Sequence, residues 1–193
     1  NAGGPAPVGS IETVDYDHAM QAISVLYGGV LLGTKYAAPI MKKQRSGSII
    51  NNASVAGHLA GYSTSMVYSS DKAAVHQLTR STAMELGESN VRVNSISPGL
   101  TATGIFGKAL GLESNAAEQS ADIAVEVLGN SQPIPRAGLP EDIARAAVFF
   151  ASDDSSFINA ADLVVDGGLI GGRQWTAHQE AVQQLGEAFK SRL

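Results

Sequence analysis

Tyr68 and Lys72 lie four residues apart in the segment MVYSSDKAAV, residues 66–75. On a helix this spacing places two side chains on the same face. A phenol beside an ammonium group can exchange a proton, because the cation favours the phenolate of a side chain that otherwise titrates near pH ~10. The same spacing also fits two amphipathic side chains on a helix surface, so the pair alone leaves both interpretations open.

The segments around this pair alternate between helices and strands. One helix is predicted over residues 17–43, and the helix that carries Tyr68 is predicted to end at Gly87. Strands are predicted in SGSIINNAS, VRVNSISPG and ADLVVDGG, and further helices over residues 114–129, about 140–151 and about 175–190. This alternation predicts an α/β fold with a parallel sheet that helices cover on both faces.

Five segments in a fixed order form the strongest signature. They are NAG at 1–3, INNASVAG at 50–57, YSSDK at 68–72, SPGLTAT at 97–103 and GLPEDIARAAVFFASDDSSFINAADLVVDGG at 138–168. In this order and in these contexts the sequence resembles the short-chain dehydrogenase/reductase family. The resemblance implies a Rossmann-like, doubly wound parallel sheet, of which residues 1–193 form the C-terminal catalytic part as a single domain.

The resemblance further implies an NAD(P)-dependent oxidoreductase that interconverts a secondary alcohol and a ketone, with Ser54, Tyr68 and Lys72 as catalytic residues. Such a reaction needs a hydride donor, a proton donor and a group that holds the carbonyl oxygen. Tyr68 would exchange the proton and Ser54 would steady the oxygen, although a serine at a strand end also suits an ordinary turn. Lys72 would favour the Tyr68 phenolate and hold the ribose hydroxyls of the cofactor.

Binding of NAD or NADP is implied for a second set of residues. Pro98–Gly99 ends a strand at its carboxyl end, where open α/β sheets bind ligands, although a plain turn would also explain the pair. The glycine would let the backbone approach the nicotinamide ring. Thr101 replaces the family's usual aliphatic residue at a contact that the main chain makes. The full set is Asn1, Ala2, Gly3, Tyr68, Lys72, Pro98, Gly99, Thr101 and Thr103.

Two departures from the family pattern bear on activity. The family usually carries an Asn in the long helix that holds a proton-relaying water, whereas VLYGGVL places Leu26 there, which cannot hydrogen-bond a water. We expect altered proton transfer with cofactor binding retained, and Gly28 and Gly29 would let the helix bend so that a carbonyl still holds the water.

The second departure is that no glycine-rich, phosphate-binding turn precedes NAG. At about 30 residues per βαβ unit, the missing part would amount to roughly 80–90 residues, so we expect a fragment that retains strands five to seven with an apolar edge strand. The residue that separates NAD from NADP would lie in that missing part, so the sequence does not decide between them.

Composition excludes several classes of function. The net charge of −5 argues against a nucleic-acid partner, and the lack of cysteine excludes disulfides and thiol catalysis. The four histidines, at 18, 58, 76 and 178, lack metal-ligand spacing, so no metal site is predicted, and those at 58, 76 and 178 are interpreted as surface or loop residues without partners. No apolar run approaches the ~20 residues of a membrane span and no signal peptide is evident, so we expect a cytoplasmic protein.

Family resemblance also implies a homotetramer or homodimer, built partly from the helix at 17–43 and the Tyr68 helix. A face of Gly28, Gly29, Ala37 and Ala38 would allow close packing. A rival interpretation is a catalytically silent or truncated member that acts as a binding or assembly subunit, which Leu26 and the missing half favour and the intact Ser54, Tyr68 and Lys72 oppose. The alcohol or ketone substrate is not identified, because the segment at 101–137 is the least regular part of the chain.

Overall fold

The computed structural model describes residues 3–4 and 6–192. Helices and strands alternate along this part of the chain, with two short 3-10 turns, η1 and η2. The elements are α1 (Tyr16–Leu26), α2 (Gly28–Gln44), β1 (Gly47–Asn52), η1 (Val55–Gly57), α3 (Met66–Gly87), β2 (Val91–Pro98), α4 (Ile105–Ala109), α5 (Ser114–Val127), α6 (Pro140–Ala151), η2 (Asp153–Ser155), β3 (Asp162–Val165) and α7 (Trp175–Lys190).

The described strands form one parallel sheet in the order β1-β2-β3. β1 pairs with β2 from Gly47 opposite Val91 to Asn52 opposite Ile96. β2 pairs with β3 from Ser95 opposite Asp162 onward. The predicted α/β class with a parallel, partial Rossmann-like sheet is therefore confirmed, and the carboxyl ends of all three strands face the same edge.

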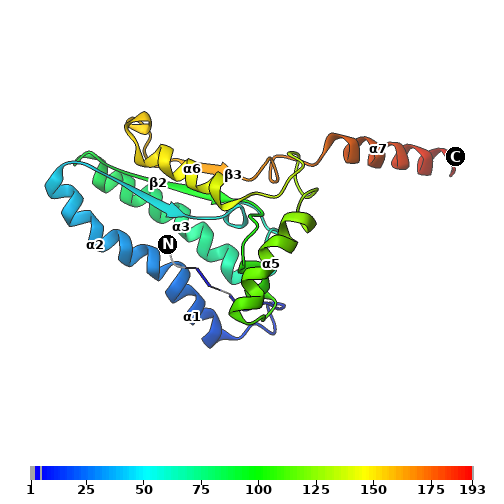
Figure 1. Cartoon of the computed structure of the whole chain (residues 1–193), viewed down its shortest axis with the longest axis horizontal. Coiled ribbons are helices and arrows are strands. Elements are labelled where there is room, and N and C mark those ends of the chain that lie inside the picture. The colour runs from blue at the N-terminus through cyan, green and yellow to red at the C-terminus, as the bar shows by residue number, and fades with distance from the viewer. Residues whose placement is uncertain (1–2, 5, 193) are drawn as a thin grey trace.

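Helices cover both faces of this sheet (Figure 1). α2 and α3 pack on one face, with α1 against α3, while α6 packs across the strands on the other face. A core of Ile49, Ala83, Leu86, Val91 and Val93 fills the space between α3 and the sheet. α7 extends away from this body in Figure 1, and the structure buries none of its residues.

The start of α3 is fixed by its own sequence. Ser65 caps the helix, because its hydroxyl accepts a hydrogen bond from the Tyr68 amide at 3.2 Å. The same hydroxyl donates to the carbonyl of Pro7 at 2.6 Å and so holds the N-terminal segment against the helix. Farther along, Asn51 Nδ2 of β1 donates to Thr79 Oγ1 at 2.9 Å. These bonds set the position of Tyr68 relative to the sheet.

The helix predicted over 17–43 is interrupted, which corrects the expectation of one continuous element. α1 ends at Leu26 and α2 begins at Gly28, with Tyr27 between them. Glycine lowers helix stability by about 1 kcal/mol relative to alanine, so the break falls beside Gly28 and Gly29, where the helix is weakest. The amide of Tyr27 still donates to the Ile23 carbonyl at 3.0 Å, so α2 continues roughly where α1 stops.

The stretch Tyr16–Gln44 is also long and apolar enough to cross a membrane by length and composition, with a mean hydropathy of 1.2 over its most apolar window. This corrects the prediction that no apolar run approaches that length. Helices that pack in the core of a domain pass the same test, and this stretch packs on α3 and β1 through one face. Its opposite face remains exposed.

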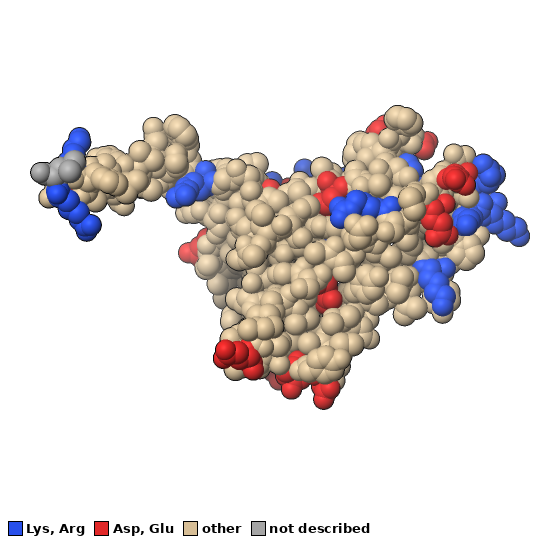
Figure 2. Space-filling view, turned by 180° about the vertical axis from the view of Figure 1, so that it is seen from behind, with Lys and Arg blue, Asp and Glu red and all other residues tan. Residues whose placement is uncertain are grey.

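Charged side chains are unevenly distributed over the surface. On the face seen in Figure 2, acidic and basic residues stand mostly toward the ends of the molecule and along its margins, and wide areas between them carry neither. The basic residues Lys42 and Lys43 lie in the last turn of α2.

Candidate active site

Ser54, Tyr68 and Lys72 come together where β1 leads toward α3. The Ser54 and Tyr68 side chains are hydrogen-bond partners. Lys72 Nζ lies 5.6 Å from the centroid of the Tyr68 ring. The structure thus places in one location the three side chains that the sequence separates by up to 18 positions.

Ser54 is held by the turn that follows β1. Its hydroxyl accepts a hydrogen bond from the Ala56 amide at 3.2 Å and caps η1. The Ala53 amide donates to the Ile96 carbonyl at 2.8 Å, which joins this turn to β2. The turn-forming role weighed for Ser54 is therefore real, and it fixes the hydroxyl beside Tyr68 instead of competing with that contact.

Lys72 is buried, with 5% of its surface exposed. Its ammonium group donates to the main-chain carbonyl of Asn52 at 2.8 Å, so it bridges α3 and the end of β1. Burial lowers the pKa of Lys72 to about 8, and the neighbouring Asp71 carboxylate partly opposes that shift.

The pKa of Tyr68 is raised above its ordinary value, because burial penalises the phenolate more than the hydrogen bond from Ser54 stabilises it. The sequence predicts a lowered pKa instead, with Lys72 as the cause. In the structure the Lys72 ammonium is directed at the Asn52 carbonyl and lies above the ring, so the phenol oxygen has Ser54 as its partner instead.

Asp71 is a buried acid that sequence reasoning did not single out. It is 6% exposed, and its Oδ2 atom has no hydrogen-bond partner. Burial raises the pKa of the Asp71 carboxyl, and the Lys72 charge opposes that effect. Asp71 and Lys72 therefore influence each other's charge from adjacent positions on α3.

Pro98 and Gly99 end β2 at the same edge of the sheet as Ser54. A Cβ atom on Gly99 would lie 2.6 Å from Cβ of Asp166, so this position requires glycine for packing against the turn after β3. The predicted approach of this backbone to a nicotinamide ring is a separate requirement and stays a prediction. The turn residues Gly167 and Gly168 have positive φ values, which favour glycine.

The other residues predicted to bind the cofactor make local contacts of their own. Thr101 forms a parallel bridge with Gly138, and Thr103 Oγ1 accepts a hydrogen bond from the Ile105 amide at 3.4 Å. Gly3 is exposed, while Asn1 and Ala2 lie outside the described residues.

The donors present fit the ribose of a nicotinamide cofactor. An ammonium group carries three N–H donors, and the contact with Asn52 uses one of those on Lys72. Lys72 and Tyr68 would hold the ribose hydroxyls, and the main chain at the carboxyl ends of β1 and β2 would face the rest of the group.

Leu26, at the position where the family usually has an Asn, is 1% exposed and belongs to the core. It is the last residue of α1, directly before the interruption at Tyr27. The side chain is thus fully enclosed by protein.

Two histidines that were expected to lack partners have them. His58 Nε2 lies 2.8 Å from Oδ2 of Asp162, and His76, which is buried on α3, lies 3.0 Å from Ser97 Oγ. Burial lowers the pKa of His76, while Asp162 opposes that effect. The prediction that these residues stand alone is wrong, because sequence separation conceals contacts made across a parallel sheet. His178 is exposed on α7, as expected of a surface histidine.

The remaining side chains near the site serve packing and support. Phe106 packs against the core cluster of Ala102, Ala124 and Ala137. Tyr62 donates a hydrogen bond to the Leu169 carbonyl at 3.2 Å. Sequence reasoning missed Gly57 and Ser65, although a serine three residues before Tyr68 is a recognisable helix cap.

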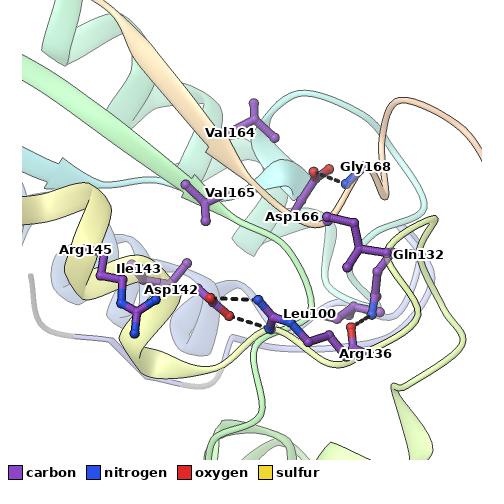
Figure 3. A pocket seen from close by; sticks show the side chains of 13 residues that line it. Leu100, Gln132, Arg136, Asp142, Ile143, Arg145, Val164, Val165, Asp166 and Gly168 are labelled. Carbon is purple, nitrogen blue, oxygen red and sulfur yellow. Dashed lines mark hydrogen bonds and ion pairs between the residues drawn. The ribbon is translucent and has the colours of Figure 1, made fainter. Parts of the chain in front are cut away.

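A pocket of about 360 Å³ lies elsewhere, between the start of α6, the end of β3 and the loop at 130–138 (Figure 3). Its charged groups largely satisfy each other, since Arg136 makes two bonds of 2.6 and 2.9 Å to the Asp142 carboxylate. Ser54, Tyr68 and Lys72 are not among its lining residues. We therefore place the candidate active site at the Tyr68 cluster, where titratable groups face one another.

Comparison with known proteins identifies the family of the chain. A family model described as enoyl-(acyl carrier protein) reductase matches residues 1–170. The chain is 36% identical over 170 residues to 2-(S)-hydroxypropyl-CoM dehydrogenase 3 of Xanthobacter autotrophicus, covering 88% of this chain and 64% of that protein. It is 41% identical over 174 residues to the short-chain dehydrogenase reductase ATA1 of Arabidopsis thaliana, covering 87% of this chain and 63% of the relative.

The fold is also similar to that of solved structures. The solved structure of ElxO with NADP bound superposes with a TM-score of 0.75 at 25% identity, covering 89% of this chain and 66% of that one. The chain thus spans less than two thirds of the length of these proteins.

Proposed function

The chain belongs to the short-chain dehydrogenase/reductase family, and we propose that it interconverts a secondary alcohol and a ketone with NAD or NADP. The observation that carries this proposal is the hydrogen bond between Ser54 and Tyr68 beside the buried ammonium group of Lys72. Tyr68 is a proton donor, Ser54 supplies a hydroxyl for the reacting oxygen and Lys72 supplies a cation. Regular elements of the fold hold all three side chains in place.

The bound nicotinamide would supply or accept the hydride. Tyr68 exchanges the proton at its phenol oxygen, and the Ser54 hydroxyl holds the same substrate oxygen. Because burial raises the pKa of Tyr68, the phenol is protonated at neutral pH, which is the form that donates a proton during reduction of a ketone. Lys72 holds the ribose and keeps a positive charge near the phenol below its pKa of about 8.

The relatives support the cofactor and the broad substrate class. ElxO holds NADP, and the Xanthobacter relative is named as a dehydrogenase of a hydroxypropyl compound. A small alcohol or ketone is accordingly the substrate class that we propose, with NAD and NADP both open. A cysteine-free chain suits a reducing cytoplasm, which is the location we infer.

We also propose that copies of the chain associate through the exposed face of α1 and α2. Ala37 and Ala38, predicted to lie at such an interface, instead pack against the chain's own core. The exposed stripe consists of Leu32, Tyr36 and Ile40, which follow one another at four-residue intervals along one side of α2. A homodimer or homotetramer would cover this stripe.

A silent binding or assembly subunit is the second candidate, and Leu26, which replaces the family's usual water-holding Asn, favours it. Burial of Tyr68 disfavours the phenolate that would accept a proton during alcohol oxidation, but it leaves ketone reduction open. The exposed apolar stripe on α2 would then be the functional surface.

Titration with NADH and NADPH separates the two candidates. The fluorescence of the dinucleotide is the suitable signal, because Trp175 is 69% exposed at the start of α7. We expect saturable binding of at least one dinucleotide, weakened at least about tenfold by Lys72→Met, the order of effect expected when a charged hydrogen-bonding partner is lost. Lys43→Met, on α2, is the matched control and should bind as the unaltered chain does. Absence of saturable binding by either dinucleotide would leave the silent subunit as the function.

A further inference from the structure

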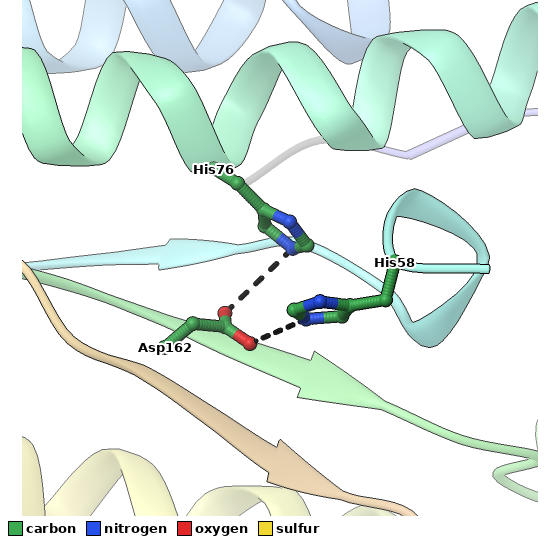
Figure 4. A group of neighbouring side chains, drawn as sticks. All are labelled: His58, His76 and Asp162. Carbon is green, nitrogen blue, oxygen red and sulfur yellow. Dashed lines mark hydrogen bonds and ion pairs between the residues drawn. The ribbon is translucent and has the colours of Figure 1, made fainter. Parts of the chain in front are cut away.

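Three side chains with metal-binding atoms converge beneath α3. His58 follows η1, His76 lies on α3 and Asp162 is the first residue of β3 (Figure 4). His58 Nε2 is 2.8 Å from Asp162 Oδ2, and His76 Nε2 is 3.7 Å from Asp162 Oδ1. All three ligand atoms lie within 4.8 Å of one another. The two histidines therefore direct their nitrogen atoms at one carboxylate from different segments of the chain.

The backbone holds each of these residues in place. His58 N donates to the Val55 carbonyl at 3.0 Å, and Asp162 is aligned opposite Ser95 in the sheet. His76 sits within α3, one turn after Lys72. Because the backbone already holds these side chains in place, less conformational entropy is lost when an ion binds.

His76 and Asp162 do not form a direct hydrogen bond with each other, because Asp162 Oδ1 has other partners. Ser95 Oγ donates to Asp162 Oδ1 at 2.5 Å and Ser97 Oγ lies 3.0 Å from the same atom. A separation of 3.7 Å between His76 and the carboxylate is too long for a hydrogen bond. The side chain of His76 is 5% exposed, that of Asp162 13% and that of His58 31%, so the cluster is enclosed but reachable past His58.

We propose that His58, His76 and Asp162 bind a divalent transition-metal ion of the zinc class. Two imidazole nitrogens and one carboxylate oxygen suit zinc and its neighbours, whereas magnesium and calcium prefer sites made of oxygen alone. Metal–ligand bonds of about 2.0–2.2 Å in a tetrahedral site separate the ligand atoms by roughly 3.3–3.5 Å. His58 Nε2 lies 2.8 Å from Asp162 Oδ2 and His76 Nε2 lies 3.7 Å from Asp162 Oδ1, on either side of that value. The three ligand atoms lie within 4.8 Å of one another, so side-chain rotations that bring both nitrogens toward one carboxylate oxygen would satisfy it.

Such an ion would join three segments that support the candidate active site. His58 is four residues beyond Ser54, and His76 is four residues beyond Lys72. Ser97 Oγ lies 3.0 Å from His76 Nε2 and 3.3 Å from His58 Nε2, beside the position of the ion. The ion would therefore fix the turn after β1 and the sheet against α3.

Metal binding by the purified chain tests this proposal directly. The chain is freed of metal by dialysis against a chelator, and Zn²⁺ is then titrated in competition with a chromogenic chelator. We expect one saturable site per chain that excess Mg²⁺ does not occupy. Co²⁺ at the same site should give the visible absorption of a tetrahedral centre. Zn²⁺ should also raise the midpoint of thermal unfolding, because a ligand that binds the folded state stabilises it.

Substitutions of the proposed ligands show whether Zn²⁺ binds at His58, His76 and Asp162. His58→Gln and Asp162→Asn should weaken Zn²⁺ binding at least about tenfold and abolish the thermal shift. His178→Gln, on the exposed α7, is the matched control and should leave both unchanged. His58→Gln is the more informative variant, because its partly exposed turn position tolerates the change even if Asp162→Asn fails to fold. Absence of a saturable site, or equal binding by His58→Gln and His178→Gln, would overturn the proposal.

Discussion

Gly57 lies directly against the main chain of Lys72. A Cβ atom at position 57 would stand 2.7 Å from the Lys72 carbonyl carbon and 2.8 Å from the Ala73 amide nitrogen. Real Cβ atoms do not approach backbone atoms this closely, so the turn that follows Ser54 can pack on α3 only if residue 57 has no side chain. The distance between the Ser54 turn and the Lys72 helix is therefore set by one glycine.

Gly57→Ala should push this turn away from α3 and separate Ser54 from Tyr68. We expect a loss of about 1–3 kcal/mol in the free energy of unfolding, as for other overpacked positions, together with weaker dinucleotide binding. Gly33→Ala is the matched control, since nothing lies within 4 Å of its Cβ position, and it should be neutral or stabilise α2 by up to about 1 kcal/mol. Urea denaturation of both variants measures the difference. An unchanged midpoint for Gly57→Ala would show that the contact does not constrain the site.

Dinucleotide binding should weaken as the pH rises through about 8. Lys72 carries its charge below its folded pKa of about 8 and loses it above, so the grip on the ribose is lost at higher pH. If only the charged form binds, affinity falls by up to about tenfold per pH unit above 8. Lys72→Arg stays charged at these pH values and should remove this dependence, while Lys42→Arg, on α2, should retain it. Affinity that is constant from pH 7 to pH 10 would contradict the role given to Lys72.

Asp71→Asn should stabilise the protein at neutral pH. The folded state raises the pKa of this carboxyl above the value of 3.8 in an unfolded chain, so the folded protein binds the proton more tightly. Stability therefore falls as the pH rises from the unfolded pKa through the folded pKa, and the penalty is fully present only above the folded pKa. Thermal unfolding at several pH values should show a higher midpoint for Asp71→Asn that converges with the unaltered chain in acid. Asp122→Asn, exposed on α5, should show no such difference.

Association of copies should depend on the stripe on α2. Tyr36→Glu places a charge on the proposed interface, where Tyr36 is 66% exposed in the single chain, and should lower the average mass measured by sedimentation equilibrium. Val182→Glu, on the exposed face of α7, is the control and should leave the mass unchanged. A monomeric unaltered chain, or identical masses for all three proteins, would refute association through α2.

The regular elements could be predicted because local signals determine them. Pro140 begins α6, Gly87 ends α3, and the apolar runs around Ile49 and Val93 form strands, all as the sequence indicates. The break at Tyr27 was missed, because two adjacent glycines signal a weak helix without showing whether it bends or stops.

The catalytic candidates could be located by resemblance, but their electrostatics could not. Burial of Tyr68 and Lys72 moves both pKa values in directions set by the surrounding protein, and helical spacing contains no information about burial. The His58–His76–Asp162 cluster joins residues up to 104 positions apart in the sequence, so no local pattern reveals it. Contacts between residues that are distant in the sequence and meet across the sheet are therefore what the sequence alone does not predict.

Turnover of a secondary alcohol or ketone shows whether Tyr68 exchanges the substrate proton. The measurement follows the absorbance of the reduced dinucleotide for the unaltered chain, Tyr68→Phe and Tyr62→Phe. Removing only the phenol oxygen of Tyr68 should lower the rate by about 10²-fold or more, the usual contribution of a general acid, while dinucleotide binding persists. Tyr62→Phe, which loses only a bond to the Leu169 carbonyl, should retain most of the rate. Equal turnover by Tyr68→Phe and the unaltered chain would show that Tyr68 does not exchange the proton.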